Sequence, residues 1–415
     1  MDFKQKLSNY AELIVKYGMN VQPDQYVRIQ FEPVTTELAR LVVQYSYQAG
    51  ARFVESKLSD PMLTKIRIEN SEDKYLEYLP KHLSTKFDEY IEEEIASCAI
   101  LGSDDPDVFE DVDPEKFNKL RMANYQVAKK YREEAINQQK VQWSLAAAST
   151  EGWAVKVFPN DTPEQAVSKL WDTIFQICRV DQENFMELWE EHDVKLKKRC
   201  EYLDSLNIQE LRFVGPGTDL TVGLSPKATF LGGRSKSNRG HLFEPNIPTE
   251  ECFTTPDFRK TTGHVSATRS FRANGVLVKD LHMEFKDGVL VNSSASAGHD
   301  AFQTFYKSDP GASQLGEVAL VGTDSPVFKS GLFFDKVLFD ENAACHIAIG
   351  SAYKKCIIGG PALNQEELDE IGVNESSVHQ DMMISSEDVD VFAKSYDSEE
   401  EVPLIQKGKF VDHLS

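Results

Sequence analysis

Hydrophobic and polar positions in the first part of the chain switch between two periodicities. Residues 4–17 place apolar side chains every three or four positions, and this spacing predicts an amphipathic helix. Residues 26–31 alternate apolar and polar side chains, which predicts a strand. A second helical stretch at 36–48 is followed by extended residues 52–57. A strand, a helix and a second strand in this order predict a parallel pairing of the two strands.

The same alternation continues to about residue 203. Strand-like runs lie at 96–101 and 141–147, and a further segment follows at 153–158. Further helices are predicted at 73–78, 85–95, 114–139, 163–177 and 183–203. We therefore expect the first half of the chain to form an α/β domain with a parallel or mixed sheet.

From about residue 210 the pattern changes to short alternating segments separated by turn residues. Gly215-Pro216-Gly217, Asn274-Gly275 and Asp287-Gly288 each separate two such segments, and Asn-Gly and Asp-Gly are strong signals of a β-hairpin. The second half is therefore predicted to be an α+β, β-rich domain with antiparallel or mixed strands. A boundary near residues 204 to 210 gives predicted domains of 1–206 and 207–415.

The charge composition restricts the classes of partner. The chain carries 67 Asp and Glu against 45 Lys and Arg, which gives a formal net charge of -22. A surface with this charge repels phosphate backbones and anionic lipids, so we expect neither nucleic acid nor a membrane as a partner. The same surface attracts cations, including metal ions and free amino groups.

Targeting features and cysteine usage favour the cytoplasm. The N-terminus lacks the basic start and apolar core of a signal peptide, and no apolar run approaches the roughly 18 residues that suggest a membrane span. Six cysteines are scattered without a CxxC pair. This distribution favours reduced thiols over a disulfide framework or a thiolate zinc site, so we expect a cytoplasmic protein.

Several carboxylates and imidazoles in the second half are candidates for metal binding. His379 and Asp381 are two positions apart in a predicted strand at 378–384, so both side chains point the same way and can reach one ion. A surface strand with outward polar residues explains this pair more simply when it is taken alone. Glu317 begins an otherwise apolar strand, where a carboxylate is either solvent-exposed or bound to a partner.

Two further pairs of residues are candidates. Glu341 and His346 are five positions apart beside an apolar run, and Tyr353 follows seven positions later. A capped turn with a hydrogen-bonded core histidine explains this segment equally well. Glu250 and Glu251 are adjacent in a proline-flanked loop. If one of these acids binds a metal, its neighbour is positioned to handle a proton, although two adjacent acids in a loop are usually just solvated.

The order of these segments is more specific than any one of them. The chain reads Asn-Ile-Pro-Thr-Glu-Glu-Cys-Phe-Thr-Thr-Pro at 246–256, and the other segments lie at 311–321, 340–350 and 378–381. Together they resemble the aminopeptidase T and aminopeptidase S family, and the similarity extends over the whole chain. This family contains exopeptidases that use two metal ions. The resemblance therefore implies a metallo-aminopeptidase that releases N-terminal residues from short peptides.

The resemblance also implies a role for each candidate residue. By position, the metal ligands are Glu251, Glu317, His346, His379 and Asp381, with Glu317 as the bridging carboxylate and Glu341 as a further ligand. Glu250 is implied as the acid that handles the proton, and Tyr353 as a ligand or a donor to the reaction intermediate. The two divalent ions are expected to be zinc or cobalt, with magnesium or manganese as alternatives, and the protein is expected to be a homodimer. One departure is Cys252, where the family usually has an aliphatic residue.

Two other functions remain open at this point. One is two-metal hydrolysis of another amide or ester bond. The motifs have no Arg or Lys cluster near them that could bind a phosphate, and this counts against a phosphoester substrate. The other is a non-catalytic peptide-binding protein that keeps a structural metal. Structural sites are usually closed by ligands such as cysteine, whereas open pairs rich in carboxylates suit catalysis.

Overall fold

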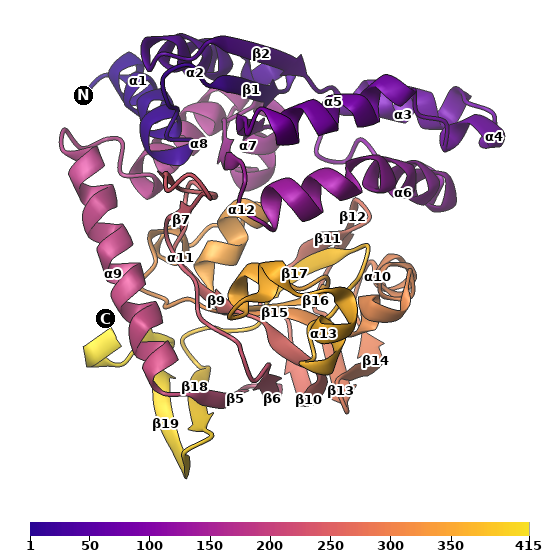
Figure 1. Ribbon diagram of the computed structural model, residues 1–415, viewed down its shortest axis with the longest axis vertical. Coiled ribbons are helices and arrows are strands. Elements are labelled where there is room, and N and C mark those ends of the chain that lie inside the picture. The colour runs from indigo at the N-terminus through magenta and orange to yellow at the C-terminus, as the bar shows by residue number, and fades with distance from the viewer. Residues whose placement is uncertain (415) are drawn as a thin grey trace. The chain divides into compact units, whose positions relative to one another are not determined.

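The computed structural model describes residues 1–414 and divides the chain into two compact units. The first unit comprises Met1–His192 and Arg234–Pro248, and the second comprises Asp193–Gly233 and Thr249–Ser415. Ser415, the last residue of the predicted C-terminal domain, lies outside the described residues. Each unit is described by itself below (Figure 1).

A four-stranded sheet forms the centre of the first unit. Its strands are β1 (Tyr26–Phe31), β2 (Phe53–Leu58), β3 (Ala96–Leu101) and β4 (Gln142–Ala147), in the order β2-β1-β3-β4. All three pairings are parallel. Val27 and Ile29 of β1 are fully buried while the residues between them are partly exposed, which is the alternation that the sequence predicts. The expected α/β fold with a parallel sheet is confirmed.

Helices connect and cover these strands. They are α1 (Phe3–Leu13), α2 (Thr36–Gln48), α3 (Pro61–Asn70), α4 (Asp73–Leu76), α5 (Lys81–Glu92), α6 (Pro114–Lys130), α7 (Glu151–Val157) and α8 (Pro163–Ile177). π-Helical turns at Ile14–Gly18 and Tyr131–Ile136 continue α1 and α6. The short strands β7 (Ser235–Lys236) and β8 (Leu242–Phe243) also belong to this unit, and α9 (Phe185–Ser205) contains the boundary with the second unit.

Two helices in this unit were not predicted as helices from the sequence pattern. α7 covers most of the segment at 153–158, and its buried residues Trp153, Ala154 and Val157 lie on one face at helical spacing. α3 was not predicted, because Ile68 is its only buried residue and an apolar stripe is missing. Its start is instead encoded by Asp60, whose side chain accepts a hydrogen bond from the backbone N–H of Met62, and by Pro61.

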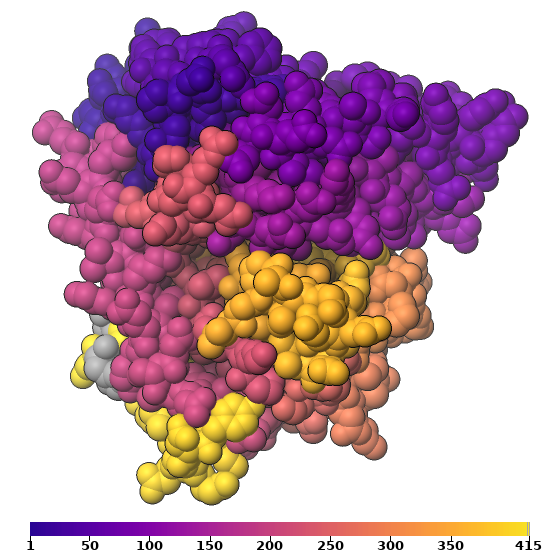
Figure 2. Space-filling model, viewed as in Figure 1, coloured from indigo at the N-terminus to yellow at the C-terminus, as the bar shows by residue number. Residues whose placement is uncertain are grey.

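An eight-stranded antiparallel sheet is the larger sheet of the second unit. Its order is β14-β13-β10-β6-β5-β18-β19-β20. The strands are β5 (Ile208–Gly215), β6 (Thr218–Leu224), β10 (Pro256–Ser266), β13 (His282–Lys286), β14 (Val289–Ser294), β18 (Asp390–Ser395), β19 (Ser398–Gln406) and β20 (Lys409–Phe410). The predicted hairpin turns at Gly215-Pro216-Gly217 and Asp287-Gly288 join β5 to β6 and β13 to β14. The β18–β19 hairpin projects from this unit as the yellow segment in Figures 1 and 2.

A smaller sheet in the same unit has the order β17-β16-β15-β9. Its strands are β9 (Cys252–Thr254), β15 (Leu315–Leu320), β16 (His346–Gly350) and β17 (His379–Met383), and all its pairings are antiparallel. Every residue of β15 and β16 is buried, so polar side chains on these strands require partners. The two antiparallel sheets confirm the predicted β-rich second half.

The remaining elements of the second unit connect these sheets. β11 (Phe271–Ala273) and β12 (Val276–Val278) form the hairpin predicted at Asn274-Gly275. The helices are α10 (His299–Tyr306), α11 (Pro326–Lys329), α12 (Val337–Asp340) and α13 (Gln365–Glu370). Among the described residues, no helix has the length and apolar character required to cross a membrane.

Candidate metal centre

The strand register of the smaller sheet brings candidate ligands from three strands onto one face. Glu317 on β15 and Asp381 on β17 both pair with Ala348 of the central strand β16. His346 is two positions before Ala348, and His379 is two positions before Asp381. Because alternate residues of a strand point to the same side, these four side chains project from the same face.

Small residues leave room for the functional side chains on this face. Ala348 lies between Glu317 and Asp381, Ala319 pairs with His346, and Gly350 pairs with His379. A larger side chain at any of these positions would occupy the space into which the carboxylates and imidazoles reach. The alternation of small and functional residues therefore creates the site within a buried sheet.

A bulge next to Glu317 also contributes to the geometry. The register between β15 and β16 shifts between Leu315 and Glu317, so Gly316 occupies the irregular position. A Cβ atom at Gly316 would lie 2.3 Å from the carbonyl oxygen of Gly350 and 2.5 Å from that of Ser351. Only glycine fits between these backbone atoms, and the bulge sets the direction in which Glu317 points.

Two groups of three donor atoms form on this face. Glu251, Glu317 and His346 make one group, and Glu317, His379 and Asp381 make the other. Within each group the ligand atoms lie within 4.8 Å of one another, and Glu317 belongs to both. Carboxylate oxygens and imidazole nitrogens suit divalent cations such as zinc, cobalt or manganese. A carboxylate shared by two groups is the arrangement expected for a bridging ligand.

The imidazole Nε2 atoms face the carboxylates directly. His346 Nε2 lies 3.2 Å from Glu251 Oε2, and His379 Nε2 lies 3.2 Å from both Glu317 Oε2 and Asp381 Oδ1. The other ring nitrogens contact backbone carbonyls: His346 Nδ1 is 3.3 Å from the oxygen of Ala344, and His379 Nδ1 is 2.8 Å from that of Ser351. This second contact orients each ring and directs Nε2 to the site, as in many metal-binding histidines.

Glu251 provides a direct test of whether the site suits a cation. Its side chain is buried, and Oε2 has no hydrogen bond of acceptable geometry to any of the described residues, although His346 is close. A buried carboxylate oxygen without a donor is costly. A divalent cation bound by the same group would remove that cost, so the residues fit a metal ion.

The electrostatics of the cluster depend on burial and on mutual charge. Burial raises the pKa values of Glu317 and Glu341, and neighbouring carboxylates raise that of Glu341 further. Burial alone would lower the pKa of His346, but Glu251, Asp381 and Glu317 outweigh it and raise the value to about 10. The pKa of His379 is raised for the same reason by Asp381 and Glu317. Without a metal ion, the imidazolium groups therefore reduce the net negative charge of the cluster, while Glu251 Oε2 still has no hydrogen bond of acceptable geometry to the described residues.

Glu341 and Asn342 belong to a 3-10 turn, Glu341–Ala343, that follows α12. Glu341 is buried close enough to Glu251 and Asp381 to be affected by their charges, but it belongs to neither of the two donor groups. Asn342 is completely buried, and its Oδ1 accepts a hydrogen bond from the backbone N–H of Glu250 at 2.6 Å. Asn342 Nδ2 donates to the carbonyl of Leu338 at 2.9 Å.

Glu250 and Glu251 lie in the loop that leads into β9. Both side chains are buried, with exposed fractions of 8% and 6%. Glu251 contributes to a donor group, whereas Glu250 does not. The hydrogen bond to Asn342 connects this loop to the turn that carries Glu341, so the structure brings all three carboxylates into one region. Asn342 was missed in the sequence, where its only signal is an amide between two acidic residues and two alanines.

Tyr353 follows β16 and packs against the same cluster. Its ring centroid lies 5.1 Å from that of His379 and 5.7 Å from that of Phe253. Burial, followed by the charges of Glu317 and Asp381, raises the pKa of Tyr353, so its hydroxyl remains protonated. The ammonium group of Lys355 lies 5.2 Å from the Tyr353 ring and brings a positive charge to this side of the site. Tyr353 therefore presents a hydrogen-bond donor beside the carboxylates.

Comparison with known proteins gives one consistent family. Residues 3–410 match the model of the family described as thermophilic metalloprotease (M29). The chain is 37% identical to aminopeptidase PepS of Streptococcus thermophilus and 37% identical to aminopeptidase T of Thermus thermophilus, each over 411 residues that cover 99% of both chains. A solved structure of wild-type AmpT from Thermus thermophilus is similar, with a TM-score of 0.90 and 35% identity, and the match covers 99% of this chain and 100% of that one.

Proposed function

This chain belongs to the M29 family of metalloproteases, and from that membership we propose that it is an aminopeptidase that removes N-terminal residues from short peptides with two divalent metal ions. The family membership confirms the expected resemblance and the prediction of a hydrolytic metalloenzyme. The observation that carries the two-metal proposal is the pair of donor groups that share Glu317.

Each donor group would hold one ion. Glu251 and His346 would bind one, His379 and Asp381 the other, and Glu317 both, with Glu341 as a further ligand. Ions bound there would lower the pKa of a water molecule and polarise the scissile carbonyl. Zinc and cobalt are the first candidates, with magnesium and manganese as alternatives, because the donor set mixes imidazoles with carboxylates.

The remaining residues would perform the proton transfer and the stabilisation of charge. Glu250 would accept a proton from the attacking water and return it to the leaving amine. The Tyr353 hydroxyl would donate a hydrogen bond to the oxyanion of the tetrahedral intermediate, which its raised pKa supports by keeping the proton in place. The substrate's free α-amino group would interact with a site carboxylate, and this contact would restrict cleavage to the N-terminal residue.

Two further expectations remain proposals. A homodimer rests on the family resemblance, and a cytoplasmic location is consistent with the six free cysteines. Sedimentation of the purified chain would test the dimer. A monomer at micromolar concentration would contradict it.

The function is tested by removing the metals with a chelator and restoring them one at a time as zinc, cobalt, magnesium or manganese. We expect cleavage of a tripeptide such as Leu-Gly-Gly to disappear and return, while N-acetyl-Leu-Gly-Gly stays intact because its α-amine is blocked. A panel of carboxylic esters and non-peptide amides measured in parallel tests the alternative of another two-metal hydrolase. No peptide cleavage with any of the four metals would refute the proposal.

A further inference from the structure

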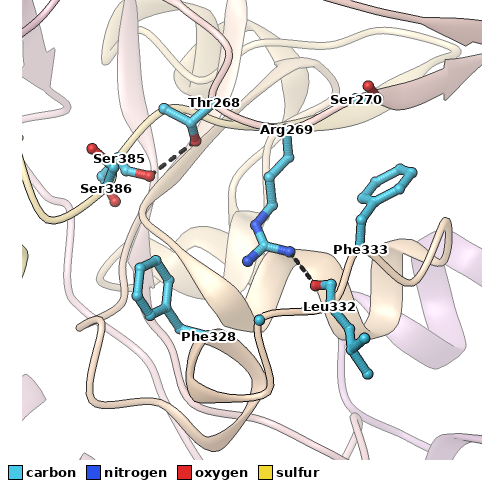
Figure 3. A pocket seen from close by; sticks show the side chains of 9 residues that line it. Thr268, Arg269, Ser270, Phe328, Leu332, Phe333, Ser385 and Ser386 are labelled. Carbon is cyan, nitrogen blue, oxygen red and sulfur yellow. Dashed lines mark hydrogen bonds between the residues drawn. The ribbon is translucent and has the colours of Figure 1, made fainter. Parts of the chain in front are cut away.

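A pocket in the second unit involves none of the candidate metal ligands. It is open to solvent and has a volume of about 400 Å³, within the size range of small-molecule sites. Three segments form it: the link between β10 and β11, the loop at the end of α11, and the residues that follow β17. Its lining residues are Thr268, Arg269, Ser270, Phe328, Gly331, Leu332, Phe333, Ser385 and Ser386 (Figure 3).

The residues that line this pocket differ in charge from the protein as a whole, although Asp340 behind them forms an ion pair with Arg269. The lining contains one guanidinium group, four hydroxyl side chains and no carboxylate, in a chain with a formal net charge of -22. Figure 3 shows the Arg269 guanidinium between Phe328 on one side and Phe333 on the other. The pocket therefore combines a partly buried cation with apolar walls.

Arg269 is only partly compensated by the protein. Its Nη1 donates to the carbonyl of Leu332 at 2.7 Å and to Asp340 Oδ1 at 3.4 Å, and this second contact is an ion pair. The carboxylate of Asp340 also accepts hydrogen bonds from two backbone N–H groups. Its Oδ1 accepts from Phe334 and its Oδ2 from Lys336, each at 3.0 Å. Within residues 1–414, Nε and Nη2 of Arg269 have no hydrogen-bond acceptor.

The surrounding hydroxyl groups add donors rather than charge. Ser386 Oγ accepts from the backbone N–H of Asp388 at 3.2 Å, and its own hydrogen is not used by any of the described residues. Thr268 Oγ1 donates to the carbonyl of Ser385 at 2.9 Å, which holds two of the lining segments together. Burial lowers the pKa of Arg269, and Asp340 offsets this only in part. An anion in the pocket would supply the missing acceptors.

We propose that this pocket binds the carboxylate of a small molecule that carries an apolar side chain, such as a free amino acid or the C-terminal residue of a short peptide. The guanidinium Nε and Nη2 atoms present two parallel N–H donors, which is the geometry that carboxylates accept in a bidentate manner. Phe328, Leu332 and Phe333 provide an apolar surface for the side chain. Asp340, the ion-pair partner of Arg269, directly precedes the proposed metal ligand Glu341 in the chain.

Binding to the metal-loaded protein is tested by calorimetry with three probes. N-acetyl-leucine has the carboxylate and the apolar side chain but no free amine, N-acetyl-leucinamide lacks the carboxylate, and inorganic phosphate lacks the apolar group. We expect N-acetyl-leucine to bind at least about tenfold more tightly than either of the others. The amide cannot form the charge-assisted hydrogen bonds with Arg269, and phosphate cannot make the apolar contacts. Equal binding of the amide, or tighter binding of phosphate, would overturn the proposal.

Substitution of Arg269 tests whether N-acetyl-leucine binds in this pocket. Arg269→Gln should weaken N-acetyl-leucine binding about tenfold or more, whereas Arg212→Gln, which removes an exposed arginine paired with Asp219, should leave it unchanged. Unchanged affinity in Arg269→Gln would mean that the carboxylate is held elsewhere, for example by the metal ions, and would refute the site.

A second pair of variants keeps the test valid if Arg269→Gln does not fold. Gly331 lines the pocket with φ of +66°, and no atom lies within 4 Å of the position that a Cβ atom would take there, so a short side chain has space. Asn and Asp both tolerate this backbone conformation and have the same shape. We expect Gly331→Asp to weaken N-acetyl-leucine binding about tenfold relative to Gly331→Asn, because the added carboxylate repels the ligand or occupies Arg269. Equal affinities in the two variants would count against the proposal.

Discussion

Asn342 accepts a hydrogen bond from the backbone N–H of Glu250 at 2.6 Å, and this contact connects the turn that carries Glu341 to the loop that carries Glu250 and Glu251. Both partners are buried. The side-chain Nδ2 of Asn342 also donates to the carbonyl of Leu338, so both the oxygen and the nitrogen of the amide are hydrogen-bonded. We therefore expect Asn342 to be a positioning residue, which holds the backbone of Glu250 relative to the donor groups.

Asn342→Ala should lower activity more than its effect on stability explains. Loss of the buried hydrogen bonds should reduce the free energy of unfolding by about 1–3 kcal/mol. Displacement of Glu250 should lower kcat about 10- to 100-fold, as is typical of residues that orient a metal site. The matched control is Ser325→Ala, which removes a 2.6 Å hydrogen bond to the carbonyl of Asn342 but not the contact with Glu250. Equal losses of kcat in the two variants would contradict a specific role for Asn342.

Glu250→Gln should separate metal binding from proton transfer. The amide keeps the size of the side chain but cannot accept the proton of water, so kcat should fall by about 10²- to 10⁴-fold. Metal content, measured by elemental analysis, should stay at the wild-type level, whereas Glu251→Gln should lose metal. Turnover near wild type in Glu250→Gln would show that another residue is the base.

Tyr353→Phe should reduce kcat and leave KM almost unchanged. The ring contact with His379 is preserved in phenylalanine, and only the hydroxyl donor is lost. A hydrogen bond to a charged group contributes about 1.5–3 kcal/mol, which corresponds to roughly a 10- to 100-fold decrease in kcat. A change confined to KM would instead indicate that Tyr353 binds the ground state.

Metal binding should release protons, and the metal-free protein should lose stability as the pH rises. The pKa of His346 is about 10 in the folded chain, above its unfolded value of about 6.5, so its stabilising contribution is complete below about pH 6.5 and lost as the pH rises toward 10. The raised pKa of Glu341 acts in the same direction above about pH 4.5, because the folded state retains a proton that the unfolded state releases. Metal ions require the deprotonated groups and displace these protons.

Calorimetry of zinc binding in buffers of different ionisation enthalpy measures this proton release at pH 7. Thermal unfolding at pH 6 and pH 9 should show a larger difference in Tm between metal-loaded and metal-free protein at pH 9. A difference in Tm between the two forms that is smaller at pH 9 than at pH 6 would contradict the expected direction of the pH dependence.

Gly316→Ala should disturb the metal centre through the backbone. The added methyl group would meet the carbonyl oxygens of Gly350 and Ser351, neither of which is a flexible side-chain end. We expect a loss of about 1–3 kcal/mol in unfolding free energy, measured by urea denaturation, and weaker metal binding because Glu317 is the next residue. Gly359→Ala is the comparison, since no atom lies within 4 Å of that position and only the cost of its positive φ is added. Equal metal affinity in the two variants would show that the bulge does not position Glu317.

The sequence predicted most elements of both halves because their signals are local. β1 and β3 begin and end at the predicted residues, and the Gly-Pro-Gly, Asn-Gly and Asp-Gly turns form hairpins as expected. α3 was missed for the same reason, since a helix with one buried residue has no apolar periodicity to detect. The types of donor residue were also visible in the sequence, as was the resemblance carried by the order of four segments.

The tertiary structure alone decided how these residues meet and which simpler explanations fail. Taken alone, Glu317 fitted a solvent-exposed strand end better than a bound carboxylate, and only the burial of β15 on both faces excludes that explanation. The antiparallel register that places Glu317 and Asp381 beside Ala348 joins strands separated by many residues, and no local pattern encodes such a pairing. The contact between Asn342 and Glu250 spans 92 positions in the chain, and its amide carries no periodicity that would reveal it.

The sequence thus determined the local elements and the chemistry available, because those depend on neighbouring residues. Long-range pairing and burial determined the site, because they depend on the whole fold.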